Sequence, residues 1–152
     1  MSWFPVLLAL HVGLAVSMLL PSVVLPFVLR RGGSITSPLT RALMTMQGGG
    51  TLIIGAGLAL TGGAMLWILG PQLLTQPWLL AALTLYAVNL AVAALISRPN
   101  LRRMVGIGSG GSAAGGDDAW SRLARRQRLV AYGMAGAIGV IGFLMSTKPR
   151  LW

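Results

Sequence analysis

The chain has 152 residues, of which 55% are hydrophobic and 9% are charged, and its formal net charge is +10. It contains no cysteine, and its only two acidic residues are adjacent in one segment. This composition excludes disulfides, thiolate metal sites and paired-carboxylate chemistry inside the apolar segments.

Four apolar runs fill most of the chain, at residues 3–29, 43–69, 78–96 and 129–145. Each is about long enough to cross a hydrocarbon core of ~30 Å as a helix that rises ~1.5 Å per residue. The sequence therefore predicts an all-α, polytopic membrane protein. In this prediction a single membrane domain, residues 1–152, forms a bundle of four transmembrane helices.

Polar side chains inside these runs are few, and the first run carries the only histidine, His11. His11, Thr61 and Tyr86 each lie eight residues inside the end of an apolar run, and the three run ends are on the same side of the membrane. At ~1.5 Å per residue, each of the three residues is therefore ~12 Å below that surface. Asn89 follows Tyr86 by three residues and shares its helix face. Because polar groups are costly to bury in a bilayer, we predict that these four side chains form one polar layer.

Two interpretations of this layer remain open. In the first, the side chains form a hydrogen-bond cluster that fixes which helices pair, with ~0.6–2 kcal/mol for each bond. In the second, the layer is a cofactor site in which a ring nitrogen of His11 binds the iron of haem b, or another metal such as copper.

In the second run a small residue recurs every four positions, and the fourth run repeats the pattern. Small residues at this spacing let two helix backbones approach closely in a membrane. We therefore predict two packing stripes, used within the protomer or with a partner subunit. The stripes are Thr51, Gly55, Ala59 and Gly63 in the second run, and Ala131, Ala135 and Gly139 in the fourth.

The connection between the third and fourth runs is rich in glycine and serine. This composition predicts a flexible cytoplasmic linker over residues 104–117. Asp117 or Asp118 is then expected to cap a helix that continues into the fourth run.

The basic residues lie outside the apolar runs and predict the sidedness of the protein. Three arginines separate the first two runs and seven separate the last two, ten of the twelve basic residues, whereas residues 70–77 contain none. The positive-inside rule therefore places both arginine-rich loops in the cytoplasm and both termini outside. The expected partners of these arginines are anionic lipid headgroups and not nucleic acid. The headgroup-binding residues are predicted to be Arg102, Arg103, Arg122, Arg125, Arg126 and Arg128.

Four segments resemble an uncharacterised family of small four-helix bacterial membrane proteins. They are LALHVGLAVSMLLP in the first run, GLALTGG in the second, ISRPNLRR after the third and the ending FLMSTKP. The family is related to CopD-type copper-resistance proteins and, more distantly, to HemJ-type protoporphyrinogen oxidases. The resemblance implies a haem, porphyrin or copper site that includes His11. The chain lacks the second histidine and the intramembrane lysine of the HemJ pattern.

No glutamate is present and the single histidine has no acid partner in the runs, so we predict no catalytic residues and no metal cluster. The predicted function is that of a small non-catalytic accessory or structural subunit of a larger energy-transducing complex, respiratory or photosynthetic. Its partners would be other integral membrane subunits and lipids, in the cytoplasmic (inner) membrane of a bacterium. The alternative is a haem- or copper-binding membrane protein of the HemJ or CopD type that uses His11.

Overall fold

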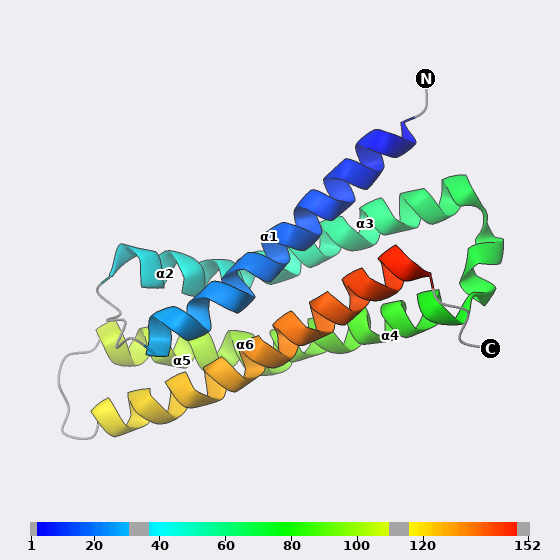
Figure 1. The fold of residues 1–152 in the computed structure, drawn as a ribbon. Helices are drawn as coiled ribbons and strands as arrows, with labels where there is room; N and C mark the ends of the chain where they lie inside the picture. Colours follow the sequence, from blue (N-terminus) through cyan, green and yellow to red (C-terminus); the bar gives the residue numbers. More distant parts are fainter. Residues whose placement is uncertain (1–2, 31–36, 110–115, 149–152) are drawn as a thin grey trace.

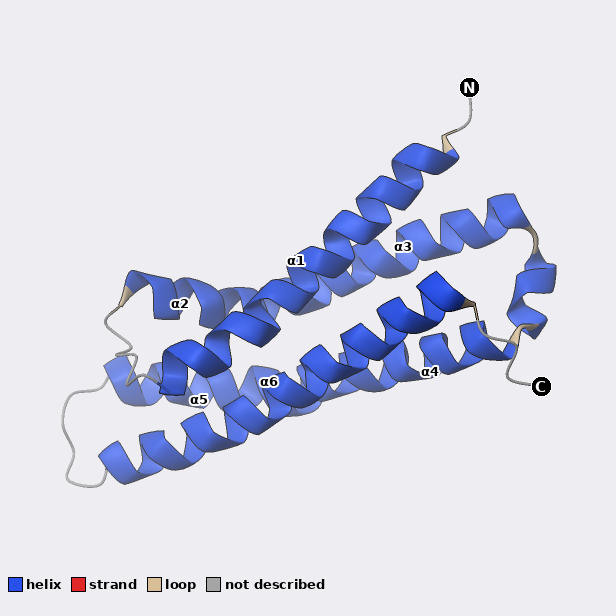
Figure 2. Cartoon of the chain, in the orientation of Figure 1, coloured by secondary structure: helices blue, strands red, loops and turns tan. Residues whose placement is uncertain are grey.

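The computed structural model describes residues 3–30, 37–109 and 116–148, and over these ranges the chain is helical with no strand (Figure 2). The predicted all-α bundle is therefore confirmed. The elements in chain order are α1 (Phe4–Arg30), α2 (Pro38–Thr45), the π-helical turn η1 (Met46–Gly50), α3 (Thr51–Leu69), the 3-10 turn η2 (Pro71–Thr75), α4 (Pro77–Val92), the π-helical turn η3 (Ala93–Ser97), α5 (Arg98–Ser109) and α6 (Gly116–Thr147).

These elements combine into four long helical rods. Helices α2 and α3 join through η1 into one rod, Pro38–Leu69, and α4 and α5 join through η3 into another, which includes the candidate membrane span Pro77–Gly106. With α1 and α6, all four rods are long and apolar enough to cross a membrane. The chain is thus a multi-pass α-helical protein, as predicted.

The helices begin and end where the local sequence requires. Proline occupies the first turn of α2, η2 and α4, where its missing N–H leaves no helical hydrogen bond unmade. Gly70 ends α3 with φ +100°, a conformation that favours glycine. A Cβ on Gly70 would also collide with the side chain of Gln72. This residue therefore fixes the tight turn between α3 and η2.

The predicted linker over residues 104–117 is wrong at both ends. Helix α5 continues to Ser109, and α6 already begins at Gly116. The α5 helix persists because it is amphipathic: Leu101 and Met104 are buried, whereas Arg102 and Arg103 are exposed. Residues 110–115 lie outside the described ranges.

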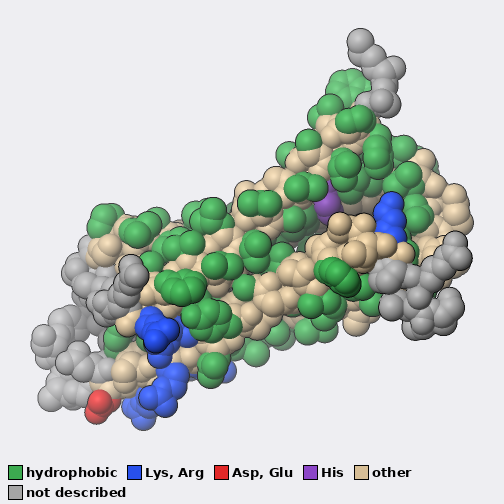
Figure 3. All heavy atoms as spheres, viewed as in Figure 1, with side chains coloured by type: hydrophobic (Ala, Val, Ile, Leu, Met, Phe, Trp, Pro, Cys, Tyr) green, Lys and Arg blue, Asp and Glu red, His purple; other side chains and the backbone are tan. Residues whose placement is uncertain are grey.

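Figure 1 shows that the start of α1 and the end of α6 lie at the same end of the bundle, which we call the far end. The opposite end, which holds α2, α5 and the start of α6, is called the arginine-rich end. Figure 3 shows most blue side chains gathered there, while hydrophobic side chains cover much of the remaining visible surface. This exterior suits a lipid environment.

Two apolar clusters hold the rods together. One lies at the arginine-rich end and joins α1, α2, α5 and α6 through seven buried residues: Leu25, Leu29, Leu43, Met44, Leu101, Met104 and Ala124. The other lies at the far end and packs Leu144 of α6 against Trp78, Leu79 and Ala82 of α4. Helix α1 takes part only in the first cluster, so its amino-terminal half is less enclosed.

Candidate functional site: polar groups between the helices

His11 and Thr61 meet between α1 and α3, as the predicted polar layer requires. The Nδ1 atom of His11 lies 2.8 Å from Thr61 Oγ1. Two glycines of α3 permit this approach, because a Cβ on Gly62 would lie 3.3 Å from His11 Cε1, and one on Gly57 would lie 3.2 Å from Leu14 Cδ1. The sequence-based stripe omitted both glycines, although their backbone forms the contact surface for α1.

The hydrogen bonds of Thr61 favour one tautomer of His11. Thr61 Oγ1 lies 2.9 Å from the carbonyl oxygen of Gly57 and 3.2 Å from that of Leu58, and it donates its single hydrogen there. It then accepts a hydrogen from Nδ1 of His11. This arrangement leaves Nε2 of the half-buried imidazole with a free lone pair, the form in which histidine binds metals.

Tyr86 and Asn89 do not join this pair. The Tyr86 hydroxyl donates to the carbonyl oxygen of Gly55, 2.5 Å away. Gly55 precedes Thr61 by six residues, ~9 Å along α3. The Nδ2 atom of Asn89 is buried and has no hydrogen-bond partner in the described part of the chain. The predicted four-residue layer therefore resolves into the His11–Thr61 pair, a separate Tyr86–Gly55 bond and an unpaired Asn89 amide nitrogen.

Each predicted small-residue stripe is only half internal. Thr51 and Gly55 are buried, but Ala59 and Gly63 are exposed, and nothing lies within 4 Å of a Cβ built on Gly63. The reason is geometric: four residues turn an α-helix by ~400°, so a four-residue repeat drifts around the helix by ~40° per step. The first stripe therefore begins in the protein interior and ends on its surface.

The stripe of α6 drifts in the same way. Ala131 is fully buried, Ala135 is half-buried and Gly139 is exposed, with open space around a Cβ built on it. The exposed face of α6 is centred on Tyr132, Gly136, Gly139 and Phe143. On this face the ring of Tyr132 makes an edge-to-face contact with Phe27 of α1, with 6.5 Å between the ring centroids. The part of this face that holds Gly136, Gly139 and Phe143 is exposed, with no atom within 4 Å of a Cβ built on either glycine.

A second polar cluster, not predicted from the sequence, lies near the arginine-rich end. Gln127 of α6 is 0% exposed; its Nε2 donates to Ser97 Oγ at 2.8 Å, and its Oε1 accepts from Asn100 Nδ2 at 2.9 Å. Asn100 Nδ2 also reaches the carbonyl oxygen of Leu123 at 3.2 Å. These bonds tie η3 and α5 to α6. A spacing signal existed, because Gln127 stands between Ala124 and Ala131 at three- and four-residue intervals, the period of a buried helix face.

Other buried polar atoms have no hydrogen-bond partner among the described residues. Both polar atoms of the Gln47 side chain are in this state, and so are Thr40 Oγ1 and Asn100 Oδ1. Gln47 belongs to η1, which packs against η3. Single π-helical turns inside α-helices frequently mark functional regions. The neighbourhood of the two π turns is therefore the most polar part of the bundle interior.

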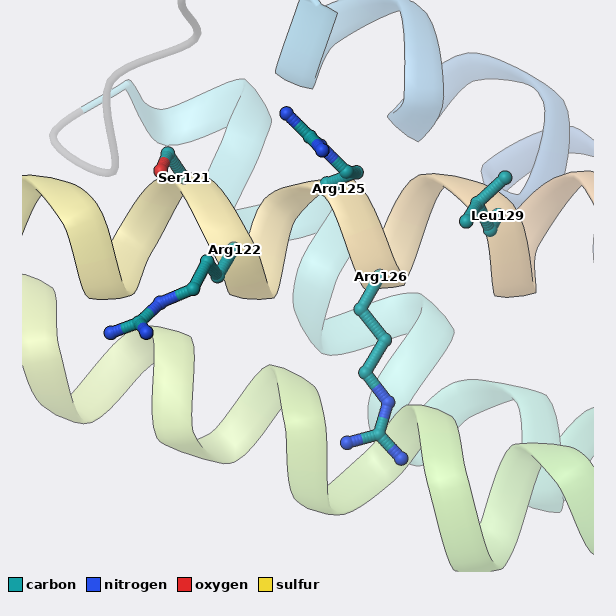
Figure 4. A pocket seen from close by; sticks show the side chains of 5 residues that line it. All are labelled: Ser121, Arg122, Arg125, Arg126 and Leu129. Carbon is teal, nitrogen blue, oxygen red and sulfur yellow. The ribbon is translucent and has the colours of Figure 1, made fainter.

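The predicted headgroup arginines lie on the surface of the arginine-rich end. Arg102, Arg103, Arg122, Arg125 and Arg126 are exposed, and Arg128 is half-exposed. Figure 4 shows Arg122 and Arg126 extending to one side of α6 and Arg125 to the other. With Ser121 and Leu129 they line a shallow hollow of about 310 Å³ formed by α6 alone. Among the side chains that the structure describes, no salt bridge joins an arginine to Asp118.

No family model, curated protein or solved structure matches the chain. The fold and the polar groups define the class: an α-helical protein with four helices able to cross a membrane. Within the described residues, no group of three or more histidine, cysteine, aspartate or glutamate side chains is placed to hold a metal ion.

Proposed function

We propose that this protein is a non-catalytic integral membrane subunit that joins a larger assembly through the exposed face of α6. One observation carries the proposal. The α6 helix is the least buried of the four rods: 11% of its most apolar stretch is buried, against 33% for α1. Its exposed face includes Gly136 and Gly139, with open space around both.

Glycines on a lipid-facing surface are best explained by a second helix. Lipid tails gain nothing from a missing side chain, whereas a neighbouring helix can bring its backbone closer and gain dispersion contacts. Phe143 and Tyr132 flank the glycines and would border the contact. The occupant we propose is a transmembrane helix of another integral subunit, and an energy-transducing complex of a bacterial inner membrane remains the proposed host.

The test compares two variants in which leucine replaces a glycine that faces open space in the structure. Gly139→Leu should reduce the amount of co-purifying membrane partner by about tenfold, because the leucine forces the partner helix away. Gly63→Leu on α3 should leave that amount unchanged. Helix content should equal that of the wild type in both variants. Equal recovery of the same partners from Gly139→Leu and wild type would refute this docking face.

A second candidate function is cofactor binding at His11, as the resemblance to the HemJ and CopD groups suggests. The observation in its favour is the hydrogen bond to Thr61, which orients the ring and leaves Nε2 free. An absorption spectrum of the gently purified protein tests it. A stoichiometric haem band that disappears in His11→Gln, while Thr61→Val only shifts or weakens it, would favour this function over the structural one.

A further inference from the structure

We propose that the groove between η1 and α5 binds one anionic phospholipid. In this proposal the phosphate lies on Arg98 and Arg102, and an acyl chain lies over Gly48 and Gly49. The groove has a volume of about 270 Å³ and is lined from both rods. This site does not depend on the docking face of α6, because no α6 residue lines it.

The walls of the groove suit a hydrocarbon chain. Val105 of α5 is its exposed apolar side chain, and the almost fully buried Leu101 and Met44 form its floor. The opposite wall is backbone, because the π turn presents two consecutive glycines. A Cβ on Gly48 would be 3.6 Å from Leu101 Cδ1, whereas a Cβ on Gly49 would meet nothing within 4 Å. The missing side chain of Gly49 thus leaves room beside an apolar wall.

The charge of the groove suits a phosphate. Arg98 and Arg102 are one helical turn apart, so their side chains leave the same face of α5. Guanidinium groups bind phosphate oxygens in paired hydrogen bonds, with planar geometry that matches the anion. The side chains that the structure describes offer these two arginines no acidic partner, and Asp118, the one acid among them, lies on α6. Their charges are therefore available to an external anion.

The groove lies near the end of an apolar run, where a lipid presents both its headgroup and the start of its acyl chains. Arg98 lies two residues beyond the apolar run that ends at residue 96, so the guanidinium groups are expected where the hydrocarbon core gives way to headgroups. Gly48 lies beside Leu101, between the two arginines along α5, and its rod is long and apolar enough to cross a membrane. Basic pockets between transmembrane helices at a membrane face are the usual sites for anionic headgroups.

The hollow on α6 provides an internal comparison. The hollow has more charge than the groove, because it is lined by Arg122, Arg125 and Arg126 (Figure 4). All its lining residues come from one helix, and no glycine is among them. Such a surface attracts anionic lipids in general through charge, without holding one molecule in place. Removal of two arginine charges from the groove should therefore lower the retention of a bound anionic lipid more than removal of two arginine charges from the hollow.

The experiment uses the purified full chain in mild detergent, mixed with equal amounts of phosphatidylglycerol and phosphatidylcholine, and native mass spectrometry counts the lipids retained. The wild type should keep about one phosphatidylglycerol. Arg98→Gln with Arg102→Gln should lower its retention by about tenfold, while Arg122→Gln with Arg126→Gln should leave it within twofold. Gly49→Leu keeps every charge but places a side chain in the groove beside Gly48, so it should also lose the lipid.

Three results would overturn the proposal. They are equal retention by the two double variants, equal retention of phosphatidylcholine by the wild type, and retention by Gly49→Leu equal to that of the wild type. Displacement of the lipid by millimolar inorganic phosphate would likewise contradict it, since the site would then bind the anion without the chain. Should the Arg98 and Arg102 variant not fold, Gly49→Leu decides alone, because its side chain enters open space.

Discussion

The two ends of the bundle are built on different principles. At the arginine-rich end, apolar side chains of α1, α2, α5 and α6 share one cluster, and the hydrogen bonds of Gln127 join α6 to the neighbouring rod. At the far end, α1 leaves the packed core. Every buried residue of α1 lies between Met18 and Leu29, and none lies in residues 4–17. Figure 1 shows this amino-terminal half diverging from α6.

This difference separates the part of the molecule that fixes the fold from the part that is free to meet a partner. In a bilayer, helices gain no hydrophobic free energy by associating, so close packing and hydrogen bonds must hold them. The arginine-rich end has both. The far half of α1 has the His11–Thr61 bond and two close glycine contacts from α3. We therefore expect substitutions at the arginine-rich end to affect stability, and those on the open faces to affect assembly.

The largest expected effect concerns which side of the membrane each end faces. The natural chain has no cysteine, so one introduced cysteine reports one position. Thr75→Cys at the far end should react with a membrane-impermeant maleimide in intact spheroplasts. Ser121→Cys at the arginine-rich end should react only after permeabilisation, because the positive-inside rule places it in the cytoplasm. Both wild-type residues are exposed, which matches the two probes. The reverse pattern would invert the proposed topology.

The next effect distinguishes the buried and exposed halves of one stripe. A Cβ on Gly55 would lie 2.5 Å from Leu90 Cδ1 and 3.5 Å from the Tyr86 hydroxyl. Gly55→Leu should therefore displace the side chains of Leu90 and Tyr86 and cost about 1–3 kcal/mol of stability. Gly63→Leu has open space and should change stability by less than about 0.5 kcal/mol. Unfolding in mixed micelles measures both, and equal losses would show that Gly55 is not a packing contact.

A third comparison uses two glutamines that are both 0% exposed. Gln127→Met removes two hydrogen bonds and leaves Ser97 Oγ without a partner, whereas Asn100 Nδ2 keeps its bond to the Leu123 carbonyl oxygen, so the change should cost about 1–2 kcal/mol. Gln47→Met removes an amide that has no described partner and should be neutral or slightly stabilising. The unfolding midpoint of each variant against the wild type is the measurement. A larger loss for Gln47→Met would mean that its amide is paired in the membrane-bound protein.

The sequence was sufficient for the helices because length and hydropathy in a bilayer leave few alternatives to spanning helices. It was insufficient for the polar contacts. The number of residues from the end of each apolar run correctly predicts that His11 and Thr61 lie at the same depth and meet. This number carries no information about the rotation of a helix about its axis, and the rotation of α4 turns Tyr86 toward Gly55. The four-residue repeat erred for the same reason, since it ignored the drift that carries Gly63 to the surface.

The apolar runs do not reveal the Gln127 cluster, because its residues lie among arginines, beyond the ends of these runs. Hydropathy treats Asn100 and Gln127 as ordinary interfacial residues. Their burial depends on α5 and α6 remaining helical beyond the apolar runs and packing together, which a glycine-rich composition obscured. The period of the flanking small and apolar residues was the better indicator there.

The smallest expected effect is at His11, where the open half of α1 makes its polar contact. His11→Leu should cost only about 0.6 kcal/mol, the average for a hydrogen bond between membrane helices. The loss is small because Thr61 keeps its bonds to the carbonyl oxygens of Gly57 and Leu58 and is not left unpaired. His11→Gln should lose less, since an amide can still donate to Thr61. A loss above about 2 kcal/mol in His11→Leu, measured by unfolding in micelles, would mean that the imidazole holds more than this one contact. That result would favour a ligand bound to His11 in the amino-terminal half of α1.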